Sequence, residues 1–212
     1  MVFLYYARIF SLSELLGDEG VLRLPSYLPD VFVVDDARRS AIETAVNILN
    51  RGDNVLLVGA PGTGKTALMF MILSKMFESK GIGYILEGAR SITNDHLGEG
   101  LIVFYDDIPR MNVDALRSIV RNRVRGVIAT ARSEELAIVR RLTGIDLYKH
   151  FNVINVPPLS PESIRDMLLR YVEVEAIRIV EKEAIDIIVK KAQGLPVYVW
   201  QVIRELKIKR AD

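Results

Sequence analysis

The chain has 212 residues, of which 50% are hydrophobic and 26% are charged, and its formal net charge is +1. A chain of this length can bury a substantial core, and its near-neutral charge gives it no overall attraction to nucleic acid. It contains no cysteine, which excludes disulfides, thiol catalysis and thiolate metal sites. His96 and His150 are its two histidines and lie far apart in the sequence, which argues against a zinc site.

Residues 1–30 are predicted to form an irregular N-terminal arm. The chain opens with an apolar run that has no basic residue before it and is cut short by Arg8, so it resembles neither a signal peptide nor a membrane span. Pro25 and Pro29 mark turns. We therefore expect a cytoplasmic protein that does not associate with membranes.

Alternating strands and helices are predicted from residue 31 to residue 157. The apolar segment 31–34 precedes a helix at residues 37–50. The predicted strands are residues 54–58, 83–87, 101–105, 126–130 and 153–156, and the predicted helices between them are residues 66–79, 91–97, 113–121 and 134–142. Nearly continuous apolar strands with intervening helices indicate an α/β fold, in which helices cover both faces of a parallel sheet.

The sequence GAPGTGKT, from Gly59 to Thr66, is a complete phosphate-binding loop of the Walker A type. It follows a predicted strand and opens a predicted helix, so its backbone N–H groups can hold phosphate at a helix N-terminus. In this pattern Lys65 would bridge the β- and γ-phosphates, and Thr66 would bind Mg²⁺. The predicted nucleotide-binding residues of this loop are Gly59, Ala60, Pro61, Gly62, Thr63, Gly64, Lys65, Thr66 and Ala67.

Two carboxylates, Asp106 and Asp107, follow the apolar strand predicted at residues 101–105. At this distance from a phosphate-binding lysine, the pattern is typical of a Walker B strand. Asp106 would then bind Mg²⁺ together with Thr66, and Asp107 would act as the general base for an attacking water. Paired acids at a strand end can also form a simple solvated turn.

A third polar strand end is predicted at Thr130, with Arg132 two residues later. Beside the Walker B strand, Thr130 could sense the γ-phosphate, and Arg132 could place a charged fork on the same phosphate. A solvated surface arginine is the simpler alternative for Arg132.

The pattern becomes purely helical after Pro157 and Pro158. Ser160 is placed as an N-cap, with proline and glutamate in the first turn of the helix that follows. Helices are predicted at about residues 161–172, 181–193 and 196–207. The sequence thus predicts an arm at 1–30, a phosphate-binding core at 31–157 and a small helical lid at 158–212.

Taken together, these motifs resemble the AAA+ and STAND branches of the P-loop ATPases, including the origin-recognition, clamp-loader and NB-ARC-like types found in archaea. The phosphate-binding loop, the FYDD strand, the T-x-R strand end and VPPLSPESI at residues 156–164 occur in the family's order, across residues 31–207. The resemblance implies a five-stranded parallel sheet of order 5-1-4-3-2 with an all-helical lid. It also implies ATP or ADP with Mg²⁺ as cofactors, and ATP hydrolysis with Lys65, Asp107, Thr130 and Arg132 as the catalytic residues.

Gly194, Leu195 and Pro196 resemble the GLP motif of NB-ARC-type ATPases, in which the proline lies against adenine. By this resemblance the adenine would lie between Pro196 and the segment formed by Val31, Phe32 and Val33.

The chain departs from the family's pattern at two places. Val197 stands where AAA+ lids usually carry a sensor arginine, and Lys149-His150-Phe151 stands where Ser-Arg-Phe would supply an arginine finger. A finger would have to come from Arg140 or Arg141, which as helix residues are more simply solvated.

Three uses of the nucleotide remain open from the sequence. The chain could be a motor or loader that acts on DNA or on replication and recombination proteins, with ATP-dependent homo-oligomers. It could be a slow STAND-type switch, or a scaffold that binds ATP without hydrolysing it. Arg117 and Arg121 offer a DNA-facing helix surface, with a solvated face as the alternative. Aspartate instead of glutamate at position 107 leaves the hydrolysis rate open.

Overall fold

A computed structural model describes residues 31–80, 84–87, 101–108, 113–121, 126–174 and 182–211. The predicted N-terminal arm and the helix predicted at residues 91–97 lie outside these residues.

The described residues alternate between strands and helices up to β5 and are helical after it. The elements are α4 (Asp36–Asn50), β1 (Val55–Val58), α5 (Lys65–Lys80), β2 (Tyr84–Glu87), β3 (Leu101–Tyr105), α6 (Val113–Arg121), β4 (Val127–Ala131), α7 (Glu135–Thr143), the 3₁₀ turn η3 (Leu147–Lys149), β5 (Asn152–Asn155), α8 (Pro161–Val174), α9 (Lys182–Ala192) and α10 (Pro196–Ala211). The predicted α/β class is confirmed.

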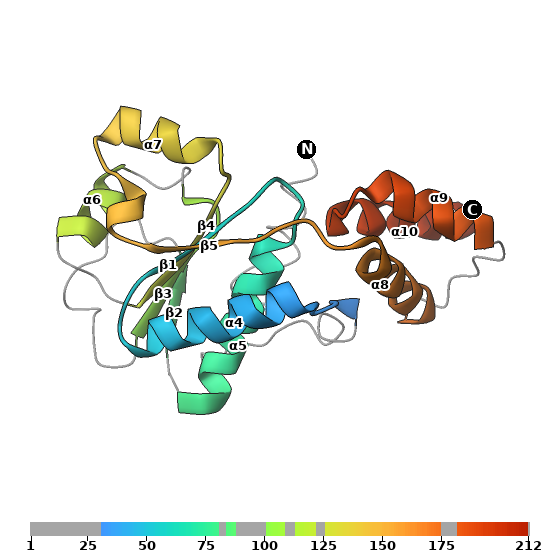
Figure 1. Ribbon diagram of the computed structural model, residues 1–212, viewed down its shortest axis with the longest axis horizontal. Helices are drawn as coiled ribbons and strands as arrows, with labels where there is room; N and C mark the ends of the chain where they lie inside the picture. The colour runs from blue at the N-terminus through green and yellow to red at the C-terminus, as the bar shows by residue number, and fades with distance from the viewer. Residues whose placement is uncertain are drawn as a thin grey trace.

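The strands form one sheet in the order β2-β3-β4-β1-β5, with every neighbouring pair parallel (Figure 1). β1 lies between β4 and β5, and Leu57 is in register with Thr130 of β4 and Ile154 of β5. Because all strands run the same way, the residues that follow β1, β3 and β4 meet at one edge of the sheet. This edge brings the phosphate-binding loop and the two acids together.

Alternate residues of β1 face two separate cores. Val55 and Leu57 pack with α4 and α5, whereas Leu56 and Val58 pack with α6 and α7. All four side chains are at most 2% exposed. Burial on both faces explains why the strand is apolar throughout, without the alternation of a half-exposed strand.

Helices α8, α9 and α10 pack against one another beyond the edge of the sheet and form the C-terminal helical unit, residues 161–211 (Figure 1). Ile164, Leu168 and Val199 are fully buried in its core, and Trp200 packs against it. The unit begins as predicted at a serine cap, since the Ser160 hydroxyl accepts the Ser163 backbone N–H at 3.1 Å.

The segment 31–33 contributes to two cores at once. Val31 and Val33 are buried in the core of the helical unit, whereas Phe32 between them is buried in the core formed by α4 and α5. Neighbouring residues of this short segment pack into different cores, so the segment joins the helical unit to the sheet.

Within the part of the chain that the structure describes, none of the helices is long and apolar enough to cross a bilayer.

Candidate nucleotide-binding site

The loop between β1 and α5 has the backbone shape that its glycines permit. Gly62 and Gly64 have φ values of 81° and 89°, a region that other residues rarely adopt. Thr63 between them is fully buried, and its hydroxyl donates to the Ala60 carbonyl at 3.0 Å. The loop therefore holds a fixed turn at the N-terminus of α5, where free backbone N–H groups favour an anion.

Lys65 folds back on this loop. Its ammonium group donates to the carbonyls of Gly59 and Ala60, at 2.9 Å each, and the side chain is only 8% exposed. Burial lowers the pKa of Lys65, and the nearby Asp106 carboxylate opposes that shift. Among the contacts of the described residues the buried Lys65 ammonium group is held by two neutral carbonyls, which makes it a favourable partner for an incoming phosphate.

Asp106 joins two threonines from different elements. Its carboxylate accepts the Thr66 hydroxyl at 2.9 Å and the Thr130 hydroxyl at 2.7 Å. Thr66 belongs to α5, and Thr130 lies in β4 and is 2% exposed. The structure thus brings together three of the predicted site residues at the same edge of the sheet.

Asp106 is exposed as a residue, but neighbouring protein groups partly bury its carboxylate. This burial raises the pKa of Asp106, while the hydrogen bonds from Thr130 and Thr66 oppose the rise. A carboxylate whose charge is poorly solvated gains when a cation approaches it.

Asp107 has a backbone conformation that is unusual for a residue other than glycine. Its φ is 64°, and its N–H donates to the Thr130 hydroxyl at 2.8 Å. Aspartate tolerates the left-handed region better than most residues do. The Thr130 hydroxyl thus contacts both acids, Asp106 at its carboxylate and Asp107 at its backbone N–H.

Arg132 is held by Glu135. Its backbone N–H donates to the Glu135 carboxylate at 3.2 Å, and its Nε lies 3.6 Å from the other carboxylate oxygen. The side chain is close enough to Lys65 for its charge to lower the pKa of that lysine.

The helical unit touches the phosphate-binding loop directly. The Val197 N–H donates to the Gly62 carbonyl at 3.4 Å, and a Cβ placed on Gly62 would lie 2.4 Å from a Val197 methyl group. On the next glycine, Gly64, a Cβ would lie 3.6 Å from the Phe32 ring and 3.7 Å from Pro196. Of the residues predicted around the adenine, Phe32 and Pro196 therefore lie beside the loop, whereas Val31 and Val33 are buried in the core of the helical unit.

These residues fit a nucleotide and a divalent cation. The loop offers a turn of backbone N–H groups, and the hydroxyl and carboxylate of Thr66 and Asp106 are oxygen donors of the type that Mg²⁺ prefers. No group of three or more His, Cys, Asp or Glu side chains suited to a metal occurs among the described residues.

The family model of "Novel STAND NTPase 3" matches residues 36–174, well over half of the chain. The chain belongs to the STAND NTPases. The match runs from the start of α4 to the end of α8 and so contains the phosphate-binding loop, both acids and Thr130. The resemblance to the STAND and AAA+ P-loop ATPases is confirmed.

This STAND NTPase is also similar to RuvB proteins. It is 34% identical over 110 residues to the Holliday junction branch migration complex subunit RuvB of Streptococcus equi subsp. equi (strain 4047), covering 47% of this chain and 32% of that protein. The RuvB Holliday junction branch migration motor of Thermotoga maritima matches with a TM-score of 0.58 and 18% identity, over 82% of this chain and 61% of that one. The chain thus spans less than two thirds of either relative.

Domain III of the replication initiation protein DnaA from Thermotoga maritima covers this STAND NTPase more fully. Its TM-score is 0.59 at 15% identity, over 89% of this chain and 91% of that one. Likeness at this level of identity shows a shared fold, in which a parallel sheet is followed by a helical unit.

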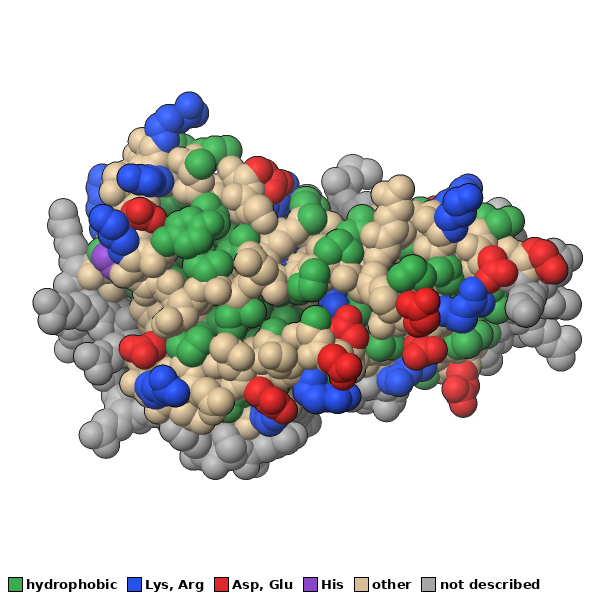
Figure 2. Space-filling model, viewed as in Figure 1, with side chains coloured by type: hydrophobic (Ala, Val, Ile, Leu, Met, Phe, Trp, Pro, Cys, Tyr) green, Lys and Arg blue, Asp and Glu red, His purple; other side chains and the backbone are tan. Residues whose placement is uncertain are grey.

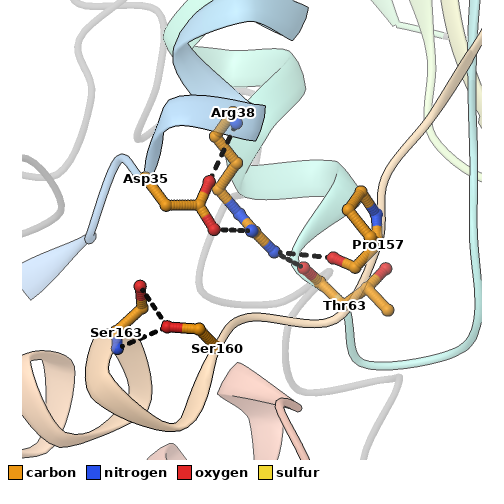
Figure 3. Close-up of polar contacts among 6 residues, drawn as sticks. All are labelled: Asp35, Arg38, Thr63, Pro157, Ser160 and Ser163. Atoms are coloured by element: carbon orange, nitrogen blue, oxygen red, sulfur yellow. Dashed lines mark hydrogen bonds and ion pairs between the residues drawn. The ribbon is translucent and has the colours of Figure 1, made fainter.

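Sequence reasoning missed Arg38 in this STAND NTPase. Arg38 is 1% exposed and lies beside the loop and the junction to the helical unit (Figure 3). A signal was present, because Arg38 lies three and four residues before Ala41 and Ile42 on the buried side of α4. An arginine on the apolar stripe of a helix calls for a buried partner.

The other arginines considered from the sequence lie elsewhere. Arg140 is exposed and lies 3.8 Å from Asp146, and Arg141 is also exposed. Figure 2 shows basic side chains over the α7 end of the molecule, whereas the helical unit carries both signs of charge. Arg117 is exposed on α6, and the side chain of Arg121 lies outside the described residues. Arg204 stacks over Trp200, 5.6 Å from the ring centre, within the helical unit.

Proposed function

We propose that this STAND NTPase binds ATP or ADP with Mg²⁺ and hydrolyses ATP, and that residues 31–157 form the nucleotide-binding core with residues 158–212 as its lid. The observation that carries the proposal is the hydrogen-bonded set of Thr66, Asp106 and Thr130 beside Lys65. These side chains come from α5, β3's end and β4 and meet where the loop can hold phosphate.

The loop and the first turn of α5 would hold the phosphates. Lys65 would exchange the Gly59 and Ala60 carbonyls for phosphate oxygens, a stronger partner for its charge. Thr66 and Asp106 would hold Mg²⁺, which neutralises phosphate charge when it is bound.

Hydrolysis would depend on Asp107, Thr130 and Arg132. Asp107 would orient water and accept a proton from it. The Thr130 hydroxyl holds Asp107 in position by accepting a hydrogen bond from the Asp107 backbone N–H. Arg132 would stabilise phosphate charge in place of a residue from another subunit. To do so its side chain would have to leave Glu135.

The adenine would lie near Phe32 and Pro196, beside Gly64. The side chains of Val31 and Val33 are buried in the core of the helical unit, at 1% and 7% exposure, so contacts to adenine from this segment would come from its backbone.

A slow switch read by another protein is the use that we favour, since the family match is to STAND NTPases and Val197 contacts the loop where AAA+ relatives place an arginine. The names of the RuvB and DnaA relatives support the second candidate, in which the chain handles DNA or replication and recombination proteins as a homo-oligomer. Arg140 and Arg141 on exposed α7 are the arginines that such an assembly would present to a neighbouring subunit.

The experiment is to measure the binding of fluorescent ADP and ATP and the Mg²⁺-dependent release of phosphate. Lys65→Ala should abolish both, whereas Lys75→Ala, an exposed lysine on the same helix, should change neither. Equal nucleotide binding by wild type and Lys65→Ala would refute the proposal. Light scattering of Asp107→Asn in ATP–Mg²⁺ separates the two uses, because a motor should form a ring and a switch should stay monomeric.

A further inference from the structure

The guanidinium of Arg38 lies between the phosphate-binding loop and the junction to the helical unit (Figure 3). Its Nη2 donates to the Thr63 carbonyl at 2.9 Å and to the Pro157 carbonyl at 3.1 Å. Thr63 belongs to the loop, and Pro157 lies between β5 and α8. One buried nitrogen therefore connects the two backbone segments that would have to move relative to each other when a lid moves.

Asp35 fixes the orientation of this arginine. One of its carboxylate oxygens caps α4 by accepting the Arg38 N–H at 2.8 Å, and the other pairs with Arg38 Nη1 at 2.9 Å. Burial lowers the pKa of Arg38 and the charge of Asp35 opposes the shift. Because a guanidinium stays charged even so, Arg38 is a rigid donor with a fixed direction.

A second set of contacts runs from the loop to the same helical unit. Gly62, which precedes Thr63, accepts the Val197 N–H at the start of α10. The junction in turn meets the turn before α10, since the Leu159 N–H donates to the Gly194 carbonyl at 2.8 Å. Adjacent loop residues thus contact the helical unit at its junction and at its last helix.

We propose that Arg38 is a positioning residue that couples the conformation of the phosphate-binding loop to the position of the helical unit. The proposal rests on the proposed function, because phosphate in the loop is what would change its conformation. When Lys65 leaves the Gly59 and Ala60 carbonyls for phosphate, the loop loses two of its internal contacts. A shift of the Thr63 carbonyl is then passed through the guanidinium to Pro157.

The substitution Arg38→Lys tests this coupling. Lysine keeps the charge next to Asp35, but its single ammonium group lacks the planar fork that reaches Asp35, Thr63 and Pro157 together. Arg39→Lys is the matched control, because Arg39 is the next residue on the same helix and pairs only with the exposed Asp36 among the contacts described. Asp35→Asn is a second variant, which keeps a capping side chain and removes the charge that orients Arg38.

Absence of cysteine in the chain makes a distance measurement direct. Asn47→Cys on α4 and Lys190→Cys on α9 place spin labels at two exposed positions, one on each side of the junction. Pulsed electron spin resonance then gives their distance distribution without nucleotide, with ADP–Mg²⁺ and with a non-hydrolysable ATP analogue. Nucleotide binding and thermal stability are measured on the same samples.

We expect wild type and Arg39→Lys to show a narrow distance that shifts when nucleotide binds. Arg38→Lys should broaden the nucleotide-free distribution, remove the shift and weaken ADP binding about tenfold. Asp35→Asn should also broaden the distribution, reduce the shift and weaken ADP binding, each to a smaller extent. If Arg38→Lys fails to fold, the result with Asp35→Asn tests the coupling instead. A distance that shifts equally in Arg38→Lys and wild type, or a wild type that binds nucleotide without any shift, overturns the coupling.

Failure of the proposed function gives a different result. A wild type that binds neither ADP nor ATP would refute nucleotide binding and, with it, the coupling. The nucleotide-free distributions of wild type and Arg38→Lys would still show whether Arg38 positions the helical unit.

Discussion

The Thr66 hydroxyl lies 2.9 and 3.1 Å from the two oxygens of the Asp106 carboxylate. Thr66 lies in the first turn of α5 and Asp106 follows β3, so this contact joins the phosphate-binding loop to the neighbouring acids. The two groups that would hold Mg²⁺ are thus in contact with each other in the structure. Little rearrangement of the protein is needed to form the proposed cation site.

Thr66→Ala should weaken the binding of ATP in the presence of Mg²⁺ by about tenfold or more, because it removes one proposed ligand and a partner of Asp106. Binding measured in excess chelator should change much less. Thr66→Ser, which keeps the hydroxyl, is the control and should behave like wild type. An equal loss with and without Mg²⁺ would count against a metal role for Thr66.

Asp106→Asn should stabilise the protein near neutral pH when no nucleotide is added. It should also remove the Mg²⁺ dependence of nucleotide binding. Burial raises the pKa of Asp106 above its ordinary value of 3.8, so the folded state holds the proton more tightly than the unfolded state. The contribution of protonated Asp106 to the free energy of unfolding is therefore full below pH 3.8. It is lost as the pH rises through the raised pKa of the folded state.

The gain from Asp106→Asn should be less than about 1 kcal/mol, because the carboxylate reaches solvent. Urea unfolding of both proteins between about pH 4 and pH 8 measures it. The difference in unfolding free energy should grow in favour of the variant as the pH rises. A difference that does not change with pH would contradict the assigned burial of Asp106.

Gly62→Ala should displace the helical unit from the loop. The new Cβ would lie 2.4 Å from a Val197 methyl group. The alanine would also have to adopt the φ of 81° that Gly62 has. Gly144→Ala is a matched control, since Gly144 has a φ of 73° but nothing within 4 Å of the added atom.

Both glycine variants should lose about 1 kcal/mol of stability from backbone strain. Only Gly62→Ala should also increase proteolysis at the junction between β5 and α8. Adding Val197→Ala to Gly62→Ala should restore resistance to the protease. Equal proteolysis of the two single variants would show that the helical unit does not depend on the Gly62 contact.

Asp107→Asn should abolish phosphate release and leave both the fold and nucleotide affinity intact. Asparagine also tolerates the left-handed backbone, so the φ of 64° costs it little. Asp107→Ala should lose activity too, but with about 1 kcal/mol of added instability. Single-turnover phosphate release and thermal unfolding separate these effects. Turnover that persists in Asp107→Asn would assign the base to another residue.

The sequence was sufficient to predict the bounds of the strand and the helix on either side of the phosphate-binding loop to within one residue. The strand before Gly59 and the helix after it follow from an apolar run and a glycine-rich turn, which are local signals. The serine cap at Ser160 is local as well, and the structure has it as predicted. Such features depend on residues only a few positions apart.

Contacts between distant segments could not be predicted in this way. That Arg38 would reach the carbonyls of Thr63 and Pro157 depends on how α4 packs against the sheet, and a backbone carbonyl leaves no trace in the sequence. The same holds for Val197, which the motif comparison identified only as a missing arginine. The structure adds the contact that Val197 makes, a hydrogen bond from its N–H to the Gly62 carbonyl.

The division of Val31, Phe32 and Val33 between two cores has a consequence for how the chain is synthesised and cut. The core of the helical unit contains residues from both ends of the described chain, so it cannot be complete until α10 has left the ribosome. A fragment that starts after Pro157 would lack Val31 and Val33 and would expose the apolar surface they cover. Fragments for separate study should therefore keep this segment, or supply it as a fused peptide.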